Sequence, residues 1–351
     1  MIHPEVPLFS LRRPCHLAIL LFLVALSAAS LGRAQAAVFT ITPTFDSSIT
    51  NDSNSTAIEG AINSAIGVLE AQISTPINVN IYFQETNSGL GGSSTGLYST
   101  YYYDYYHQLK AVDTAPGASS AQQTAFASLG SAPTGLSSGN PVNNNNFVYM
   151  TAPNARALGF NAPGYVTVAG QNQNYDTVVS LNTSLTYPPK ANNGSNYGLQ
   201  AVAAHEINEA LGIGGTGSNL AAGISGSIGV LDLYRYSAPG VRSYSPTSPS
   251  SYFSINGGNT VLSYFNQTSG PDYGDWLSNP IPAGYGPQVQ DAYGAPGTNP
   301  ALGVNELTAL NVIGYNLSTT SVPEPASVVV WLLLALAMAG PLWRRVQRPL
   351  R

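Results

Sequence analysis

Hydrophobic and polar positions alternate in two short stretches near the start of the chain. This alternation predicts strands at 38–45 and 77–83. Between them, apolar residues recur at spacings of three and four, from Ile58 to Ile73, which predicts an amphipathic helix that ends before Pro76. A strand, a helix and a strand in this order favour a right-handed crossover in a small sheet.

The remaining pattern adds short strands and a few helices to this start. Further strands are expected at 147–150, 164–168 and 177–181, and helices at 98–112, 199–211 and 304–315. The segments 89–96, 114–146 and most of 213–316 are rich in Gly, Ser, Asn and Pro and are expected to be loops. We find no repeat and no linker that would divide this region. The pattern therefore predicts one α+β domain with a small twisted sheet and a loop-rich C-terminal part.

The N-terminal end has the features of a secretory signal peptide. Arg12 and Arg13 precede an apolar run, 17–31, and the residues Ala34-Gln35-Ala36 form a small-x-small cleavage site. We therefore assign 1–36 to a signal peptide and expect the protein to be exported. Cleavage after Ala36 would remove Cys15, the only cysteine, so no disulfide is expected in the exported protein.

The C-terminal end carries a second targeting segment. Val322-Pro323-Glu324-Pro325 is followed by an apolar run, 326–343, and then by Arg344 and Arg345. The run is long enough for a transmembrane helix. In this order, the three features resemble the PEP-CTERM sorting signal of Gram-negative bacteria. The resemblance implies that an exosortase recognises 322–351 and that the protein ends at the cell surface or outside the cell. The alternative is a plain C-terminal membrane anchor.

Charge limits the partners of the domain between these ends, 37–321. Seven of the 12 Lys and Arg residues and two of the 17 acidic residues lie in the end segments. The domain keeps five basic and fifteen acidic residues, a net charge near −10. Such a charge disfavours nucleic acid and anionic lipid as partners. We expect membrane contact only through the C-terminal helix.

Chemistry is concentrated in the segment His205-Glu206-Ile207-Asn208-Glu209, inside the predicted helix 199–211. It matches the zinc-peptidase motif H-E-x-x-H except that Glu209 replaces the second histidine. Positions i and i+4 share one helix face, and both imidazole and carboxylate bind zinc. The motif therefore predicts Zn²⁺ ligands at His205 and Glu209, with Glu206 as general base. The alternative is a surface helix with polar side chains.

A zinc site needs at least one more ligand. The only other histidine of the domain, His107, lies in a tyrosine-rich helix and is the less favoured candidate. The carboxylates downstream of the motif are Asp232, Asp272, Asp275, Asp291 and Glu306. Asp232 best matches a third ligand about twenty residues or more downstream. Its alternative role is a salt bridge to Arg235 or Arg242, or a helix cap.

Two tyrosines next to Asp232 are candidates for a further catalytic role. Tyr236, or Tyr234, could donate a hydrogen bond to an oxyanion during peptide hydrolysis. The alternative for each is aromatic packing in the core.

Several segments together resemble one family over nearly the whole domain. They are the motif 205–212, then 231–243, 252–258, Asp272-Tyr273-Gly274-Asp275-Trp276, and 307–315. In this order they are similar to a family of exported bacterial zinc metalloproteases that often carry PEP-CTERM tails. The resemblance implies a zincin-like domain, with His205 and Glu209 as zinc ligands and Glu206 as base.

Two functions of different classes follow. The first is an exported zinc endopeptidase that hydrolyses a protein or peptide substrate. The second is a non-catalytic surface or extracellular-matrix protein on a zincin scaffold. A calcium-binding adhesin is less favoured, because no D-x-[DN]-x-[DN]-G loop is present. Zinc content separates the first two functions.

Overall fold

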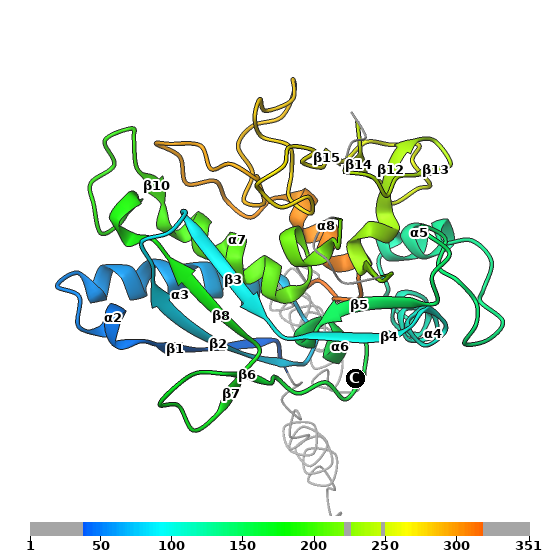
Figure 1. Ribbon diagram of the computed structural model, residues 1–351, viewed down its shortest axis with the longest axis horizontal. Helices are drawn as coiled ribbons and strands as arrows, with labels where there is room; N and C mark the ends of the chain where they lie inside the picture. The colour runs from blue at the N-terminus through cyan, green and yellow to red at the C-terminus, as the bar shows by residue number, and fades with distance from the viewer. Residues whose placement is uncertain (1–37, 221–225, 247–249, 319–351) are drawn as a thin grey trace, which may run out of the picture. The chain divides into compact units, whose positions relative to one another are not determined.

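The computed structural model describes residues 38–220, 226–246 and 250–318 (Figure 1). The predicted signal peptide, 1–36, and the predicted sorting segment, 322–351, lie outside these residues. Across the described part of the chain, every helix is too short or too polar to span a bilayer. Helices and several small sheets are combined, which confirms the predicted α+β class.

The largest sheet near the N-terminus has the strand order β1-β2-β8-β3. Its strands β1 (Thr40–Phe45), β2 (Asn78–Glu85) and β8 (Thr177–Leu181) are parallel. Helix α3 (Ser55–Gln72) connects β1 to β2, and its apolar stripe is buried. The predicted strand–helix–strand unit is therefore confirmed.

The edge strand β3 (Gly91–Thr95) corrects the expectation of a loop at 89–96. It pairs antiparallel with β8 over its whole length, from Gly91 opposite Leu181 to Thr95 opposite Thr177. Its Gly and Ser residues carry no apolar pattern. The strand forms because β8, distant in the sequence, supplies the ladder of hydrogen bonds, and such a partner is not visible in local propensity.

Helix α7 (Leu199–Leu211) carries the motif and has the predicted bounds. It packs against α3 on one face of the sheet and against β3 (Figure 1). Gly212 ends the helix with φ of 104°, a left-handed conformation that favours glycine. Its N–H bonds to the carbonyl groups of Asn208 and Glu209. Nearly all side chains of α7 are buried, so the motif is held on a rigid element.

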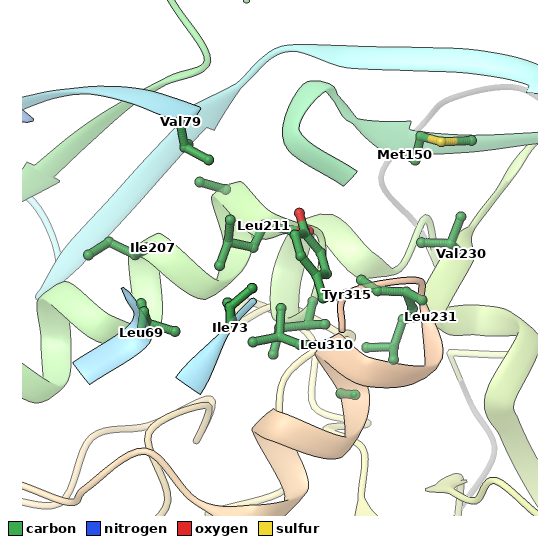
Figure 2. Close-up of a cluster of buried hydrophobic side chains, with 14 of the residues drawn as sticks. Leu69, Ile73, Val79, Met150, Ile207, Leu211, Val230, Leu231, Leu310 and Tyr315 are labelled. Carbon is green, nitrogen blue, oxygen red and sulfur yellow. The ribbon is translucent and has the colours of Figure 1, made fainter. Parts of the chain in front are cut away.

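Three helices far apart in the sequence meet in one hydrophobic core. Side chains from α3, from α7 and from the C-terminal helix α8 (Val304–Val312) converge there (Figure 2). Tyr315 follows α8 and donates a hydrogen bond of 2.9 Å from its hydroxyl to the carbonyl of Leu211. Burial of each large apolar side chain contributes about 1.5–3 kcal/mol. The core residues at this junction include Leu69, Ile73, Ile207, Leu211 and Leu310.

The other elements surround this framework. Two further sheets have the orders β11-β5-β4 and β13-β12-β14-β15. Their strands are β4 (Leu97–Tyr101), β5 (Phe147–Thr151), β11 (Ile228–Gly229), β12 (Arg235–Ala238), β13 (Val241–Arg242), β14 (Tyr252–Phe253) and β15 (Ser263–Tyr264). Two small pairs are β6 (Val166–Thr167) with β7 (Asn174–Tyr175), and β9 (Thr186–Tyr187) with β10 (Tyr197–Gly198). Additional helices are α2 (Ser47–Thr50), α4 (Tyr102–Asp113), α5 (Ser120–Ser128) and α6 (Ala152–Ala157). Short 3₁₀ turns are η1 (Thr183–Leu185), η2 (Gly214–Gly217) and η3 (Val230–Tyr234).

Helix α5 corrects the expectation that 114–146 is irregular throughout. The side chain of Ser119 accepts from the N–H of Gln122, and the side chain of Gln122 accepts from the N–H of Ser119. This reciprocal capping box starts the helix although few apolar residues follow.

A buried carboxyl group in α4 gives a stability prediction. Asp113 is fully buried; its Oδ1 accepts from Gln122 Nε2 at 3.3 Å, and its Oδ2 has no hydrogen-bond partner in the described structure. Burial raises the pKa of Asp113 to about 8, far above its ordinary value of 3.8. The folded protein therefore keeps a proton that the unfolded chain loses, which costs stability as pH rises from about 4 to about 8.

We expect Asp113→Asn to raise the free energy of unfolding by a few kcal/mol at neutral pH. The gain should grow from about pH 4 to about pH 8 and stay level above it, because the folded wild-type carboxyl is ionised there as well. Denaturant titrations at several pH values measure it. The control Asp104→Asn makes the same chemical change at a partly exposed position on the same helix. A gain in stability that does not depend on pH would contradict the raised pKa of Asp113.

Candidate metal centre

A cleft of about 1100 Å³ lies along α7. Its walls are α7, the start of β3 and two loops of the C-terminal part, at 269–275 and 288–300. No Lys or Arg of the described residues lines it. The ionisable side chains that line it include His205, Glu206, Glu209, Asp272, Asp275 and Asp291.

Three of these side chains form a group that could hold a metal ion. His205, Glu209 and Asp275 each offer one ligand atom, and these atoms lie within 4.8 Å of one another. His205 Nε2 is 3.6 Å from Glu209 Oε1 and 3.7 Å from Asp275 Oδ2. Two ligands of a tetrahedral zinc ion, each about 2.1 Å from the metal, would be about 3.4 Å apart. The two separations that involve His205 Nε2 are close to this value.

The His205 ring is oriented toward this group by a backbone contact. Its Nδ1 lies 2.9 Å from the carbonyl oxygen of Val289, to which an Nδ1–H donates. In that tautomer Nε2 is the nitrogen directed at Glu209 and Asp275, with the Gln290 side-chain amide 3.3 Å away, and a ring held through Nδ1–H is common among metal-binding histidines. Burial lowers the pKa of His205, but the Asp275 and Glu209 carboxylates raise it well above its ordinary value. Their negative charge favours a cation at Nε2.

Glu209 is held in place by two donors from other elements. Ser93 on β3 donates from its hydroxyl to Oε2 at 2.7 Å, and the N–H of Gly215 donates to Oε1 at 3.2 Å. Burial raises the pKa of Glu209, but the contacts with His205, Ser93 and Gly215 lower it below its ordinary value overall. The side chain is therefore kept ionised, as a ligand must be.

Glu206 occupies a different environment on the same helix. Its side chain is almost fully buried, and its Oε2 has no hydrogen-bond partner among the described residues. Burial, and then the charge of Glu209, raise its pKa well above the ordinary value. Gly91 of β3 lies against it, and a Cβ there would be 2.4 Å from Glu206 Oε1. A carboxylate with a raised pKa and a free oxygen in a cleft can accept a proton at neutral pH.

Asp275 supplies the third candidate ligand from a loop. It is buried, and its Oδ1 accepts from Gln290 Nε2 at 3.0 Å while its Oδ2 faces His205. Burial raises the pKa of Asp275 to about 8, and the charges of Glu209 and Asp272 add to this effect. Burying several carboxylates close together is unfavourable, and a bound cation would offset this cost.

The structure places Asp232, the predicted third ligand, elsewhere. Its Oδ1 accepts from the Ser218 hydroxyl and lies 3.4 Å from Arg235 Nε. Its Oδ2 accepts from the N–H groups of Asn219 and Gly229, each at 2.9 Å. Both oxygens are thus occupied in a fully buried ion pair, which is the alternative considered for Asp232. Asp275, and not Asp232, joins His205 and Glu209 in the group that could hold a metal ion.

The predicted oxyanion donor and the alternative histidine also lie outside the cleft lining. Tyr236 is buried beneath Arg242, whose Cζ is 4.8 Å from the ring centroid. Tyr234 donates from its hydroxyl to the carbonyl of Val312 at 3.0 Å. His107 is exposed on α4 and contacts the ring of Tyr103 at 4.5 Å. These positions fit packing roles, and the tyrosines that do line the cleft are Tyr197 and Tyr293.

Comparison with known proteins adds no relative: no protein-family description, curated protein or solved structure matches the chain. The functional argument therefore rests on the sequence and on the geometry of the cleft.

Proposed function

We propose that the protein is an exported zinc endopeptidase of the zincin type. One observation carries the proposal: His205, Glu209 and Asp275 converge on one point, with the buried carboxylate of Glu206 beside them on the same helix. One nitrogen and two carboxylate oxygens are a donor set that zinc accepts, with a position left for water or substrate.

Bound Zn²⁺ would supply Lewis-acid chemistry, which polarises a peptide carbonyl and makes a water molecule more acidic. His205, Glu209 and Asp275 would hold the ion. Glu206 would take a proton from the attacking water and give it to the leaving amine. Its raised pKa suits both transfers, because a base must also act as an acid within one cycle.

The shape of the cleft favours a peptide as substrate. Gly91, Gly92 and Ser93 of β3 line it, and β3 is the edge strand of its sheet. An edge strand has backbone groups without a strand partner, and an extended peptide can pair with them. Such pairing would lay a peptide along α7, past Glu206 and the metal ligands.

Metal analysis tests the proposal against a non-catalytic scaffold. The protein should retain about one zinc per chain after purification without added metal. It should also cleave an unstructured protein substrate, lose this activity to a chelator, and regain it with added zinc. A folded protein that neither holds nor takes up zinc would contradict the endopeptidase and favour the surface or matrix protein.

Export belongs to the same proposal. The motifs at 1–36 and 322–351 support processing by a signal peptidase and an exosortase. The expected location is therefore the cell surface or the extracellular medium.

A further inference from the structure

Glu306 is a fully buried carboxylate on α8, outside the cleft lining. Its Oε1 accepts from Trp276 Nε1 at 3.1 Å and from the N–H of Gln290 at 3.2 Å. Its Oε2 accepts from the N–H of Gly303 at 3.1 Å. A single charged side chain thus receives three N–H donors, two of them from loop segments that are distant in the sequence. Hydrogen bonds to an ionised acceptor are roughly twice as strong as neutral ones.

Both of these loop segments carry groups of the candidate metal centre. Trp276 directly follows Asp275, and Gln290 directly follows Val289, whose carbonyl orients His205. The Gln290 side-chain amide donates to Asp275 Oδ1 at 3.0 Å and lies 3.3 Å from His205 Nε2. Whatever fixes Trp276 and Gln290 therefore fixes the third candidate ligand and the orientation of the first.

The two segments also contact each other directly. The N–H of Trp276 donates to the carbonyl of Gln290 at 2.8 Å, and the N–H of Ala292 donates to the carbonyl of Trp276 at 3.0 Å. Glu306 ties this loop pair to α8 through Trp276 and Gln290 at once. Because α8 packs into the main core, it gives the loops a rigid reference.

We propose that Glu306 is a positioning residue for the metal centre. It holds the segments of Asp275 and Val289 against α7, so that Asp275 Oδ2 and His205 Nε2 keep the separation that a metal ion needs. The proposal rests on the metal centre of the proposed function. Groups that orient metal ligands in this way are typically worth about 10–100-fold in metal affinity.

The test compares zinc affinity in full-length Glu306→Gln and wild-type protein, by competition with a chromophoric chelator. Gln keeps the volume of the side chain but removes the charge and one of the two acceptor oxygens. We expect zinc affinity to fall by about 10–100-fold in protein that remains folded by circular dichroism.

Asp176→Asn is the matched control. Asp176 is also a buried, hydrogen-bonded carboxylate, but it pairs with Arg156 at 2.8 Å and does not line the cleft. We expect this variant to lose stability while its zinc affinity stays at the wild-type value. A merely structural role for Glu306 would make both variants behave alike.

Trp276→Phe provides a second variant in case Glu306→Gln does not fold. It removes one donor to Glu306 and keeps the aromatic packing, so a smaller but measurable loss of zinc affinity is expected. Wild-type zinc affinity in folded Glu306→Gln, or in Trp276→Phe where only this variant folds, would overturn the positioning role alone. A wild-type protein that binds no zinc would overturn the proposed function, and the positioning role with it.

Discussion

Asp275→Asn is expected to abolish stoichiometric zinc binding, whereas Asp232→Asn is expected to leave it intact. Asp275 Oδ2 lies 3.7 Å from His205 Nε2, within the group that could hold a metal. A neutral amide is a poorer zinc ligand than a carboxylate, and no other carboxylate of the described residues completes the group. The loss of zinc affinity should exceed the 10–100-fold typical of groups that only orient ligands.

Asp232→Asn is the matched control, since it makes the same chemical change in another buried carboxyl group. It breaks the ion pair with Arg235, and removing one partner of a buried pair costs about 3–5 kcal/mol. The melting temperature should fall, but protein that is still folded should bind one zinc. Metal analysis of both variants, beside their circular dichroism, gives the answer. The opposite pattern would restore Asp232 as the ligand.

The part of the site on one helix could be predicted from the sequence. His205, Glu206 and Glu209 are neighbours by helical periodicity alone, and the apolar residues around them with Gly212 define the limits of α7. The strand–helix–strand start could be predicted for the same reason. In each case the deciding contacts are short-range, and periodicity reports them.

The part of the site that depends on loops could not be predicted in this way. Asp275 and Val289 lie far along the sequence from His205 and reach it only because the C-terminal loops fold back onto α7. Spacing along the sequence does not indicate such a contact. Spacing instead favoured Asp232, whose oxygens are taken up by Gly229 and Arg235 nearby and by Ser218 and Asn219 upstream. In the sequence, the only feature that pointed to Asp275 was the segment 272–276, in which two aspartates lie beside a tryptophan. Trp276 is completely buried, and this burial fixes the loop that carries Asp275.

Glu209 stands where the zinc-peptidase motif has its second histidine, and its neighbours suit a carboxylate. Ser93 and Gly215 donate to its two oxygens, and an imidazole in the same place could not accept both hydrogen bonds. The surroundings therefore match a carboxylate at this position. Glu209 therefore has partners that hold it as a carboxylate, with Oε1 3.6 Å from His205 Nε2.

Glu206→Gln is expected to lower the rate of peptide hydrolysis by about 10²–10⁴-fold while leaving zinc content unchanged. Glu206 lines the cleft, and its buried Oε2 is an acceptor with no hydrogen-bond partner among the described residues. Gln keeps the shape beside Gly91 but cannot accept the proton. The ligands His205, Glu209 and Asp275 are untouched by the change.

The measurement is initial-rate proteolysis of an unstructured substrate at matched zinc occupancy. Glu59→Gln, on the partly exposed face of α3 and away from the cleft, makes the same chemical change and should keep the full rate. An unchanged rate in Glu206→Gln would remove Glu206 from the reaction. Loss of zinc together with loss of rate would instead make it a ligand. A low rate with full zinc occupancy assigns proton transfer to Glu206, because the metal ligands are then intact and only the base is missing. Burial and the neighbouring charge of Glu209 raise the pKa of Glu206, which suits a group that accepts and then donates a proton.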